Sequence, residues 1–183
     1  MRNLTMMTDL YQLTMMYGYY NTNNHRRQAV FDMTFRQPNN NSAYAIFAGL
    51  EQLIEYIENL HFGEEDLDYL DSLALFDKSF LDMLRGLRFT GTVVFPNEPM
   101  IRVKAPLVEA QLIETALLNI INHQTLIATK ASRVVMAAQG DSVLEFGLRR
   151  AQGPDAGIYG ARAAIIGGCS ATSNVMTGQL FGI

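Results

Sequence analysis

The sequence predicts a mixed α/β protein, with an α+β region over residues 1–125 and alternating helices and short strands over residues 126–183. In the first region, segments of period 2 and period 3.6 follow one another in mixed order, as in α+β domains. In the second region helices alternate with short strands, which is typical of βα units and a parallel sheet. Hydrophobic residues make up 49% of the 183 residues, enough to form a core.

The first 60 residues predict a helix, two strands and a second helix. Thr8 is expected to cap a helix over residues 9–20, and residues 28–36 alternate as in a strand with one solvated face. After a polar turn, residues 43–48 are expected to form the partner strand, and residues 49–60 an amphipathic helix. The expected core side of the first helix consists of Leu10, Leu13, Met16, Tyr17 and Tyr20.

The middle of the chain predicts two acidic helices, over residues 64–73 and 77–87, and then two strands. The strands cover residues 89–95 and 99–106 and are joined through Pro96 and Asn97. Pro106 suits the first turn of a long helix, because the nitrogen of proline has no hydrogen to donate there. The expected core side of this helix consists of Leu107, Ala110, Ile113, Leu117 and Ile121.

The last third of the chain alternates between helix and strand. Helices are expected over residues 127–139 and 156–168, strands over residues 142–147 and 169–173, and a further helix begins near residue 174. In βα barrels the ends of such strands carry the active site. Two βα units cannot close an eight-stranded barrel, so the sequence describes either a small open α/β protein or the front part of a longer one.

Composition excludes several classes of protein. The net charge of −4 does not support a basic nucleic-acid-binding surface. A single cysteine, Cys169, allows no internal disulfide and favours a reducing compartment. The start of the chain does not resemble a secretion signal, and the most apolar stretch, residues 107–127, is interrupted by polar side chains and is amphipathic. We therefore expect neither nucleic acid nor membrane as a partner.

Residues 145–150, EFGLRR, offer the first candidate site. An aromatic ring stacked on Phe146 could have its carboxylate or phosphate bound by the fork of Arg149 or Arg150. The alternative is an ordinary phenylalanine at a strand end, followed by two solvated arginines. The pattern alone leaves both interpretations open.

Two further segments have paired interpretations. Asp9 and Tyr11 are either a carboxylate beside an aromatic platform or a capping-turn aspartate with a core tyrosine. Residues 167–174, GGCSATSN, either approach a ligand closely or turn tightly into a helix capped by Ser173 or Asn174. Cys169 has no histidine nearby in sequence, and the spacing of the three histidines predicts no metal site.

Four separated motifs together resemble the nicotinate phosphoribosyltransferase family: TDLYQLTM at 8–15, ETALLNIINHQTLIATKASR at 114–133, EFGLRRAQGPDAG at 145–157 and GGCSATSNV at 167–175. The resemblance implies a type II phosphoribosyltransferase fold, an α+β region followed by an irregular α/β barrel that is incomplete here. It also implies synthesis of nicotinate mononucleotide from nicotinate and 5-phosphoribosyl 1-diphosphate, for NAD salvage. The implied enzyme is an ATP-coupled pentosyltransferase or ligase that uses ATP and Mg²⁺, and it is a cytoplasmic homodimer.

The resemblance also assigns roles to residues. Tyr11 and Phe146 match the two aromatic residues that sandwich the pyridine ring, and the tyrosine comes from the neighbouring subunit. Arg149 matches the arginine that faces the base and phosphate, and Asp9 an acid near the same pocket. Ser170 replaces an aspartate of the related nicotinamide enzyme and of some nicotinate enzymes, and its hydroxyl can donate to a carboxylate. Arg150 and Thr172 are weaker candidates.

In the family the phosphorylated histidine follows the position of Ile183, so the resemblance predicts an N-terminal fragment without that catalytic residue. Such a fragment is expected to lack transferase activity by itself. Two alternatives remain at this point: an enzyme similar to nicotinamide phosphoribosyltransferase, or a fragment with a non-catalytic interaction role.

Overall fold

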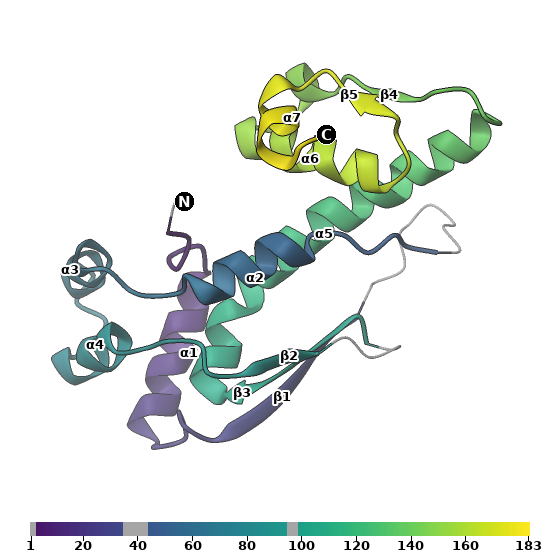
Figure 1. Ribbon diagram of the computed structural model, residues 1–183. Helices are drawn as coiled ribbons and strands as arrows, with labels where there is room; N and C mark the ends of the chain where they lie inside the picture. Colours follow the sequence, from purple (N-terminus) through teal and green to yellow (C-terminus); the bar gives the residue numbers. More distant parts are fainter. Residues whose placement is uncertain (1–2, 35–43, 95–98) are drawn as a thin grey trace. The chain divides into compact units, whose positions relative to one another are not determined.

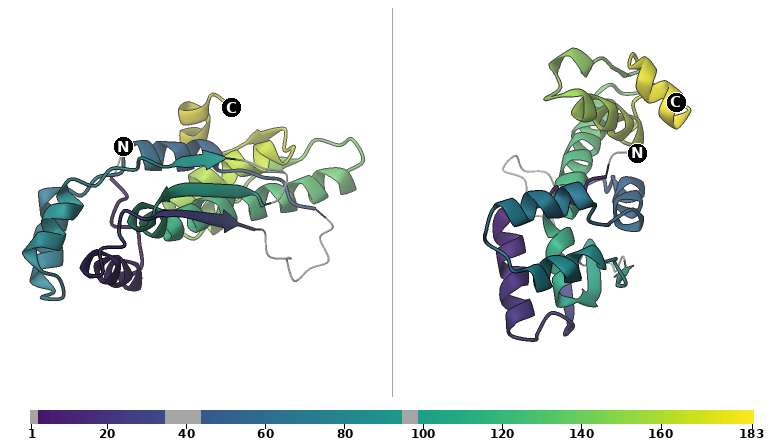
Figure 2. Two further views of the ribbon diagram at one scale, coloured as in Figure 1. Left: turned by 90° about the horizontal axis from the view of Figure 1, so that it is seen from below. Right: turned by 90° about the vertical axis from the view of Figure 1, so that its left-hand side faces the viewer.

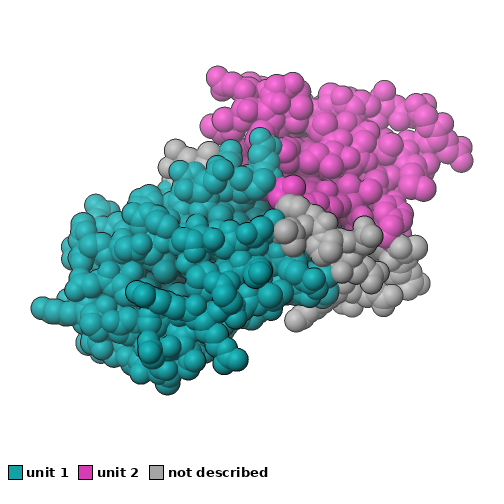
Figure 3. Space-filling model, turned by 60° about the horizontal axis from the view of Figure 1, so that its bottom comes forward, with its two compact units in different colours: residues 1–35, 51–118 teal, residues 36–50, 119–183 magenta. Residues whose placement is uncertain are grey.

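The computed structural model describes residues 3–34, 44–94 and 99–183, and the chain forms two compact units (Figure 3). Unit 1 consists of Met1–Phe35 with Glu51–Leu118, and unit 2 of Arg36–Leu50 with Asn119–Ile183. The predicted turn at residues 38–42 and the predicted connection through Pro96 and Asn97 lie outside the described residues. The domain boundary expected after residue 125 stays a prediction.

Unit 1 contains an antiparallel sheet with the strand order β1-β3-β2 (Figures 1 and 2). Its strands are β1 (Gln28–Met33), β2 (Thr92–Val94) and β3 (Ile101–Pro106). The side chains of the central strand alternate between the two faces of the sheet: Ile101, Val103 and Ala105 are buried, while Lys104 is exposed. β3 therefore supplies one apolar face to the core of unit 1.

The prediction that residues 43–48 pair with β1 is wrong, because β3 is the partner of β1. The described part of this segment, from Tyr44, forms no strand. Its backbone instead lies against a helix within unit 2: Thr129 Oγ1 accepts from Ile46 N at 2.8 Å, and Thr125 Oγ1 accepts from Ala48 N at 3.2 Å. Two buried hydroxyl groups thus satisfy amide groups that a neighbouring strand would otherwise have to satisfy.

The first helix, α1 (Leu10–Asn21), begins one residue later than predicted. Asp9 is the N-cap, and the Thr8 hydroxyl donates to the carbonyl of Leu112 at 3.4 Å, so the predicted Thr8 cap is wrong. The predicted core side is only partly buried: Leu13 and Met16 are buried, whereas Leu10 is exposed. A polar residue of α1, Gln12, takes the buried place that the apolar pattern assigned to Leu10.

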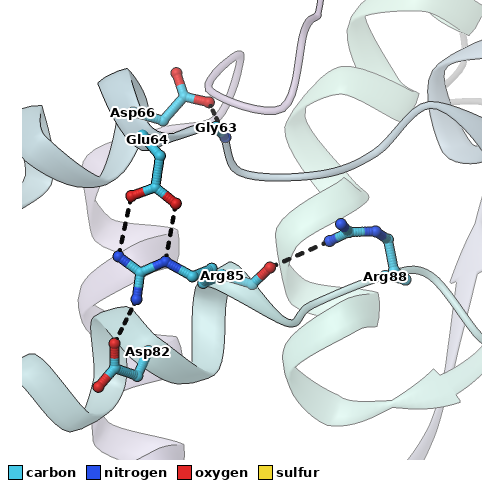
Figure 4. Close-up of polar contacts among 6 residues, drawn as sticks. All are labelled: Gly63, Glu64, Asp66, Asp82, Arg85 and Arg88. Atoms are coloured by element: carbon cyan, nitrogen blue, oxygen red, sulfur yellow. Dashed lines mark hydrogen bonds and ion pairs between the residues drawn. The ribbon is translucent and has the colours of Figure 1, made fainter.

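Three shorter helices complete unit 1: α2 (Leu50–Glu58), which begins at the boundary, α3 (Glu64–Ser72) and α4 (Lys78–Arg85). All three were predicted. The Asp77 side chain accepts from Phe80 N at 2.8 Å and caps α4. Arg85 of α4 makes a bidentate contact with Glu64 of α3, at 3.0 and 3.1 Å, and a further contact of 2.5 Å with Asp82 (Figure 4). The Glu64 pair joins α3 to α4, whereas the Asp82 pair lies within α4.

The longest helix, α5 (Leu107–Ala137), is continuous over 31 residues and belongs to both units. The separate helix predicted at 127–139 is its second half, since no proline or glycine occurs between its ends. Pro106 ends β3 rather than lying in the first helical turn. The carbonyls of Arg27 and His25 accept from the amides of Leu107 and Val108, at 2.8 and 3.4 Å, and so satisfy the start of the helix.

Unit 2 has the predicted βα arrangement, with β4 (Leu144–Glu145) and β5 (Ala171–Thr172) paired in parallel. Its further elements are the 3-10 turn η1 (Leu148–Arg150), α6 (Pro154–Ile166) and α7 (Val175–Phe181). Close packing of α6 on α5 depends on small residues: a Cβ added to Gly167 would lie 2.4 Å from the Ala128 carbonyl oxygen. Within the described ranges, no helix has the length and apolar character to cross a membrane.

Candidate functional site

The residues predicted as site residues fall into two groups, one in each unit. The strand-end cluster, in unit 2, consists of Glu145, Phe146, Arg149, Ser170 and Thr172. The α1 cluster, in unit 1, consists of Asp9, Tyr11, Gln12, Gln111 and Glu114.

The strand-end cluster is organised by the Glu145 carboxylate. Thr172 Oγ1 donates to Glu145 Oε2 at 2.6 Å, and the amide of Gly147 donates to Glu145 Oε1. The carbonyl of Glu145 also accepts from Ser173 N at 3.1 Å. Because β4 and β5 are parallel, these contacts tie the carboxyl ends of both strands together, where α/β folds place ligands.

Two arginines and one aromatic ring project from the segment that Glu145 holds. Phe146 is 58% exposed, and Arg149 and Arg150 on η1 are also exposed. Neither guanidinium forms an ion pair with any residue in the described ranges. The arrangement combines a free aromatic face with uncompensated positive charge, which suits a planar anion.

Two hydroxyl groups lie at β5, and they differ in whether they are already hydrogen-bonded. Ser170 is exposed, and its amide donates to the Val143 carbonyl at 2.8 Å, which fixes its backbone. The Thr172 hydroxyl is already used, because it donates to Glu145 and accepts from Asn174 N at 3.0 Å. Of the two, Ser170 is therefore better placed to meet a ligand.

The end of the GGCSATSN segment does cap a helix, as one interpretation predicted. The Asn174 side chain accepts from Thr177 N at 3.3 Å and donates to the Gly157 carbonyl at 3.2 Å. Cys169 is buried, and burial followed by the negative charge of Glu145 raises the pKa of its thiol. A protonated, buried thiol is a structural group rather than a nucleophile.

The α1 cluster surrounds a fully buried amide, that of Gln12. Gln12 Nε2 donates to the Tyr11 hydroxyl at 3.0 Å and to Glu114 Oε2 at 2.9 Å, and Gln111 donates to Gln12 Oε1. Asp9 Oδ2 accepts from Thr115 Oγ1 at 3.1 Å. α1 and the first half of α5 are thus joined by polar contacts that end at Tyr11.

The structure agrees fully with neither interpretation of Asp9 and Tyr11. Asp9 occupies the N-cap position of α1, but its side chain makes no capping hydrogen bond and accepts from Thr115 instead, and Tyr11 is 54% exposed and is not a core tyrosine. Partial burial, followed by the charges of Glu114 and Asp9, raises the pKa of Tyr11, so its hydroxyl stays protonated at neutral pH. Tyr11 therefore offers an exposed, uncharged ring that Gln12 holds through its hydroxyl.

Sequence reasoning missed the residues that support each cluster. Gln12 lies in an apolar helix pattern, and a polar residue at a core position was the available signal. Glu145 directly precedes Phe146 and was not assigned a role of its own. In the described ranges, no group of three or more His, Cys, Asp or Glu side chains is placed to hold a metal ion.

Comparison with known proteins points to one family. Residues 6–122 match the model of the nicotinate phosphoribosyltransferase (NAPRTase) N-terminal domain. The nicotinate phosphoribosyltransferase of Bacillus subtilis is 51% identical over 189 residues, which cover 99% of this chain and 39% of that protein. The Caenorhabditis elegans protein of the same name is 40% identical, covering 97% of this chain and 34% of that protein.

Solved structures agree with the sequence matches. Human nicotinic acid phosphoribosyltransferase superposes with a TM-score of 0.85 at 35% identity, covering 96% of this chain and 37% of that one. The nicotinate-nucleotide pyrophosphorylase of Pyrococcus furiosus, at 23% identity and a TM-score of 0.74, shares the fold. The chain therefore spans less than half the length of each of these relatives.

Proposed function

The chain belongs to the nicotinate phosphoribosyltransferase family, and we propose that it supplies the base-binding part of an enzyme that makes nicotinate mononucleotide. In this reaction the ring nitrogen of nicotinate forms a bond to C1 of the phosphoribosyl group. The bond between C1 and the diphosphate oxygen breaks, and diphosphate leaves with the electron pair. The names of the relatives and the matched N-terminal domain support this assignment.

The observation that carries the proposal is the exposed Phe146 ring beside the unpaired Arg149 at the ends of two parallel strands. The pyridine ring stacks on Phe146, and the guanidinium of Arg149 donates to the nicotinate carboxylate. Ser170 donates a further hydrogen bond to that carboxylate, at a position where an aspartate would repel it. The same preference disfavours nicotinamide, which has no negative charge for Arg149 to bind.

The α1 cluster covers the other face of the pyridine ring, and it comes from a second copy of the chain in a homodimer. Leu10 and Met15 are exposed beside Tyr11, which gives this part of α1 an apolar surface suited to an interface. The hydrogen bond from Gln12 fixes Tyr11, and the raised pKa of Tyr11 keeps the ring neutral beside an anionic substrate. Asp9, already bonded to Thr115, acts near this pocket without contacting the carboxylate.

ATP and Mg²⁺ couple energy to the transfer in the complete enzyme, through a histidine that the resemblance places after the position of Ile183. The described residues offer no metal-binding cluster, so none of them is assigned to ATP or Mg²⁺. We assign the described residues a role in binding the base. A buried, reduced Cys169 fits a cytoplasmic enzyme.

Equilibrium dialysis of radiolabelled nicotinate against the 183-residue chain tests the proposal. A charge-assisted hydrogen bond contributes about 1.5–3 kcal/mol, so Arg149→Gln should weaken nicotinate binding about 10- to 100-fold. Arg150→Gln should have a smaller effect, and Lys130→Gln, an exposed change on α5, should have none. Equal affinity for nicotinate and nicotinamide, or unchanged binding by Arg149→Gln, would contradict the proposal.

A further inference from the structure

Unit 1 contains a pocket that the residues proposed for nicotinate do not line. Its volume is about 740 Å³, and it lies among the end of α1, the loop before β1, the end of α4 and the start of α5. Small-molecule sites in proteins commonly have volumes of about 300–1,000 Å³. The pocket therefore has the size of a ligand site, and its lining indicates the class of ligand.

Two guanidinium groups of the lining, those of Arg26 and Arg88, form no ion pair with a carboxylate among the residues that the structure describes. Arg88 Nη1 donates only to backbone carbonyls, those of Leu87 at 2.6 Å and Arg85 at 3.3 Å (Figure 4). The nearby acidic side chains, Asp82 and Glu64, are instead paired with Arg85. Arg26 is exposed and has no ion pair within the described ranges.

The lining also contains a buried hydrogen-bond acceptor. Glu109 is 7% exposed, and its carboxylate accepts from Thr90 N at 2.6 Å and from Thr90 Oγ1 at 3.0 Å. No cation pairs with it among the residues that the structure describes, although its oxygens have further lone pairs. A buried carboxylate held only by neutral donors favours an N–H donor from a ligand.

The remaining walls suit a flat ring. Pro106, Val108, Leu87 and Met83 supply apolar surface, and the Tyr20 and His25 rings lie with centroids 5.1 Å apart. His25 Nδ1 is buried and has no hydrogen-bond partner within the described part of the chain. A second polar atom beside the pocket is thus left without a partner, which costs free energy unless a ligand or water satisfies it.

We propose that this pocket binds a nucleoside monophosphate whose base carries an amino group. Arg26 and Arg88 bind the phosphate, because planar guanidinium forks match phosphate oxygens. The amino group donates to Glu109, and the base packs against the apolar wall. Nicotinate mononucleotide has no such amino group, so this site is additional to the proposed transferase function.

The adjacent arginines Arg26 and Arg27 give a matched pair for the test, because only Arg26 lines the pocket. Binding of AMP, GMP and CMP to the 183-residue chain is measured by isothermal titration calorimetry. We expect saturable binding of at least one of them, and about a 10-fold or greater loss for Arg26→Gln and Arg88→Gln. Arg27→Gln should bind as the original chain does, and thermal melting by circular dichroism checks that each variant is folded.

Ribose 5-phosphate and adenosine test the two parts of the proposed site separately: the first carries the phosphate without the base, and the second carries the base without the phosphate. Each lacks one half of AMP, so each should bind at least about 10-fold more weakly than AMP. The proposal is wrong if none of the three nucleotides binds saturably at millimolar concentration. It is also wrong if adenosine binds as tightly as AMP, or if Arg27→Gln loses as much affinity as Arg26→Gln. None of these measurements involves nicotinate, so their failure would leave the proposed nicotinate site unaffected.

Discussion

The α1 cluster and the strand-end cluster hold their aromatic rings in different ways. In the α1 cluster a buried amide, Gln12, bonds directly to the Tyr11 hydroxyl, so the side chain itself is held. In the strand-end cluster Glu145 bonds to Gly147 and Thr172, so the backbone around Phe146 is held while the ring and Arg149 stay free. The Tyr11 ring is thus fixed in advance through its own hydroxyl, whereas Phe146 and Arg149 keep their freedom to adjust.

The largest expected effect is at the buried amide of the α1 cluster. Gln12→Leu removes the bonds of Gln12 to Gln111 and Glu114, so the buried Gln111 amide keeps only its 3.2 Å bond to Glu114, and the change should destabilise the chain by about 2–4 kcal/mol. Urea unfolding followed by circular dichroism measures the change. Thr14→Ala, at an exposed position of the same helix, should stay within about 0.5 kcal/mol. Equal effects of the two changes would contradict a stabilising role of the buried Gln12 amide.

A second expected effect concerns the packing beneath the strand-end cluster. In Gly167→Ala the new methyl group would meet the Ala128 carbonyl and the Ala131 side chain, so α6 and α5 must separate. We expect a loss of about 1–3 kcal/mol in the free energy of unfolding. Gly18→Ala is the matched change, because nothing lies within 4 Å of the added carbon, and it should stabilise α1 by about 0.5–1 kcal/mol. A neutral Gly167→Ala would contradict the close packing of these helices.

A third, smaller effect tests the backbone tether. Glu145→Ala removes the contacts to Thr172 and Gly147 and should cost about 1–2 kcal/mol of stability. It should also weaken nicotinate binding, because η1 and Arg149 lose their fixed backbone. Glu145→Gln keeps one acceptor oxygen and should lose less stability and less affinity for nicotinate than Glu145→Ala. If Glu145→Ala bound nicotinate normally, the strand-end cluster would not depend on its tether.

The smallest effect is a pH dependence away from both clusters, at the cap of α4. Bonds from Ser79 and then from Phe80 N lower the pKa of Asp77. A lowered pKa in the folded state means that this contribution to stability is present above the ordinary aspartate pKa and disappears as pH falls through the folded value. Asp77→Asn should therefore reduce the loss of stability between pH 6 and pH 3, measured by urea unfolding at several pH values. If Asp77→Asn lost as much stability between pH 6 and pH 3 as the original chain does, protonation of Asp77 would not contribute to that loss.

Local patterns predicted most of the elements of this chain. The helices α2, α3 and α4, the strand β3 and the parallel pairing of β4 with β5 all followed from the sequence. Residues 43–48 have a strand composition, but the Thr125 and Thr129 hydroxyls that hold this segment lie about eighty residues away in the chain. Periodicity does not report such long-range polar contacts.

The candidate site shows the same limit. Phe146 and Arg149 are exposed just after β4, which agrees with both interpretations of the EFGLRR motif, so their role as site residues stays a prediction. The exposure of Tyr11 depends on Gln12 and on Glu114, which lies 102 residues further along the chain. The sequence left open whether Tyr11 is a core tyrosine or an exposed platform, and the structure shows it exposed, with its hydroxyl bonded to the buried Gln12.

The central claim is that the α1 cluster of one copy and the strand-end cluster of another form one nicotinate site. The most direct measurement mixes two variants, Tyr11→Ala and Phe146→Ala, after unfolding and refolding them together, and titrates nicotinate. In a randomly mixed homodimer half of the dimers are mixed and each contains one intact site, so about a quarter of the sites should regain the original affinity. A mixture that binds no better than either variant alone would contradict the shared site.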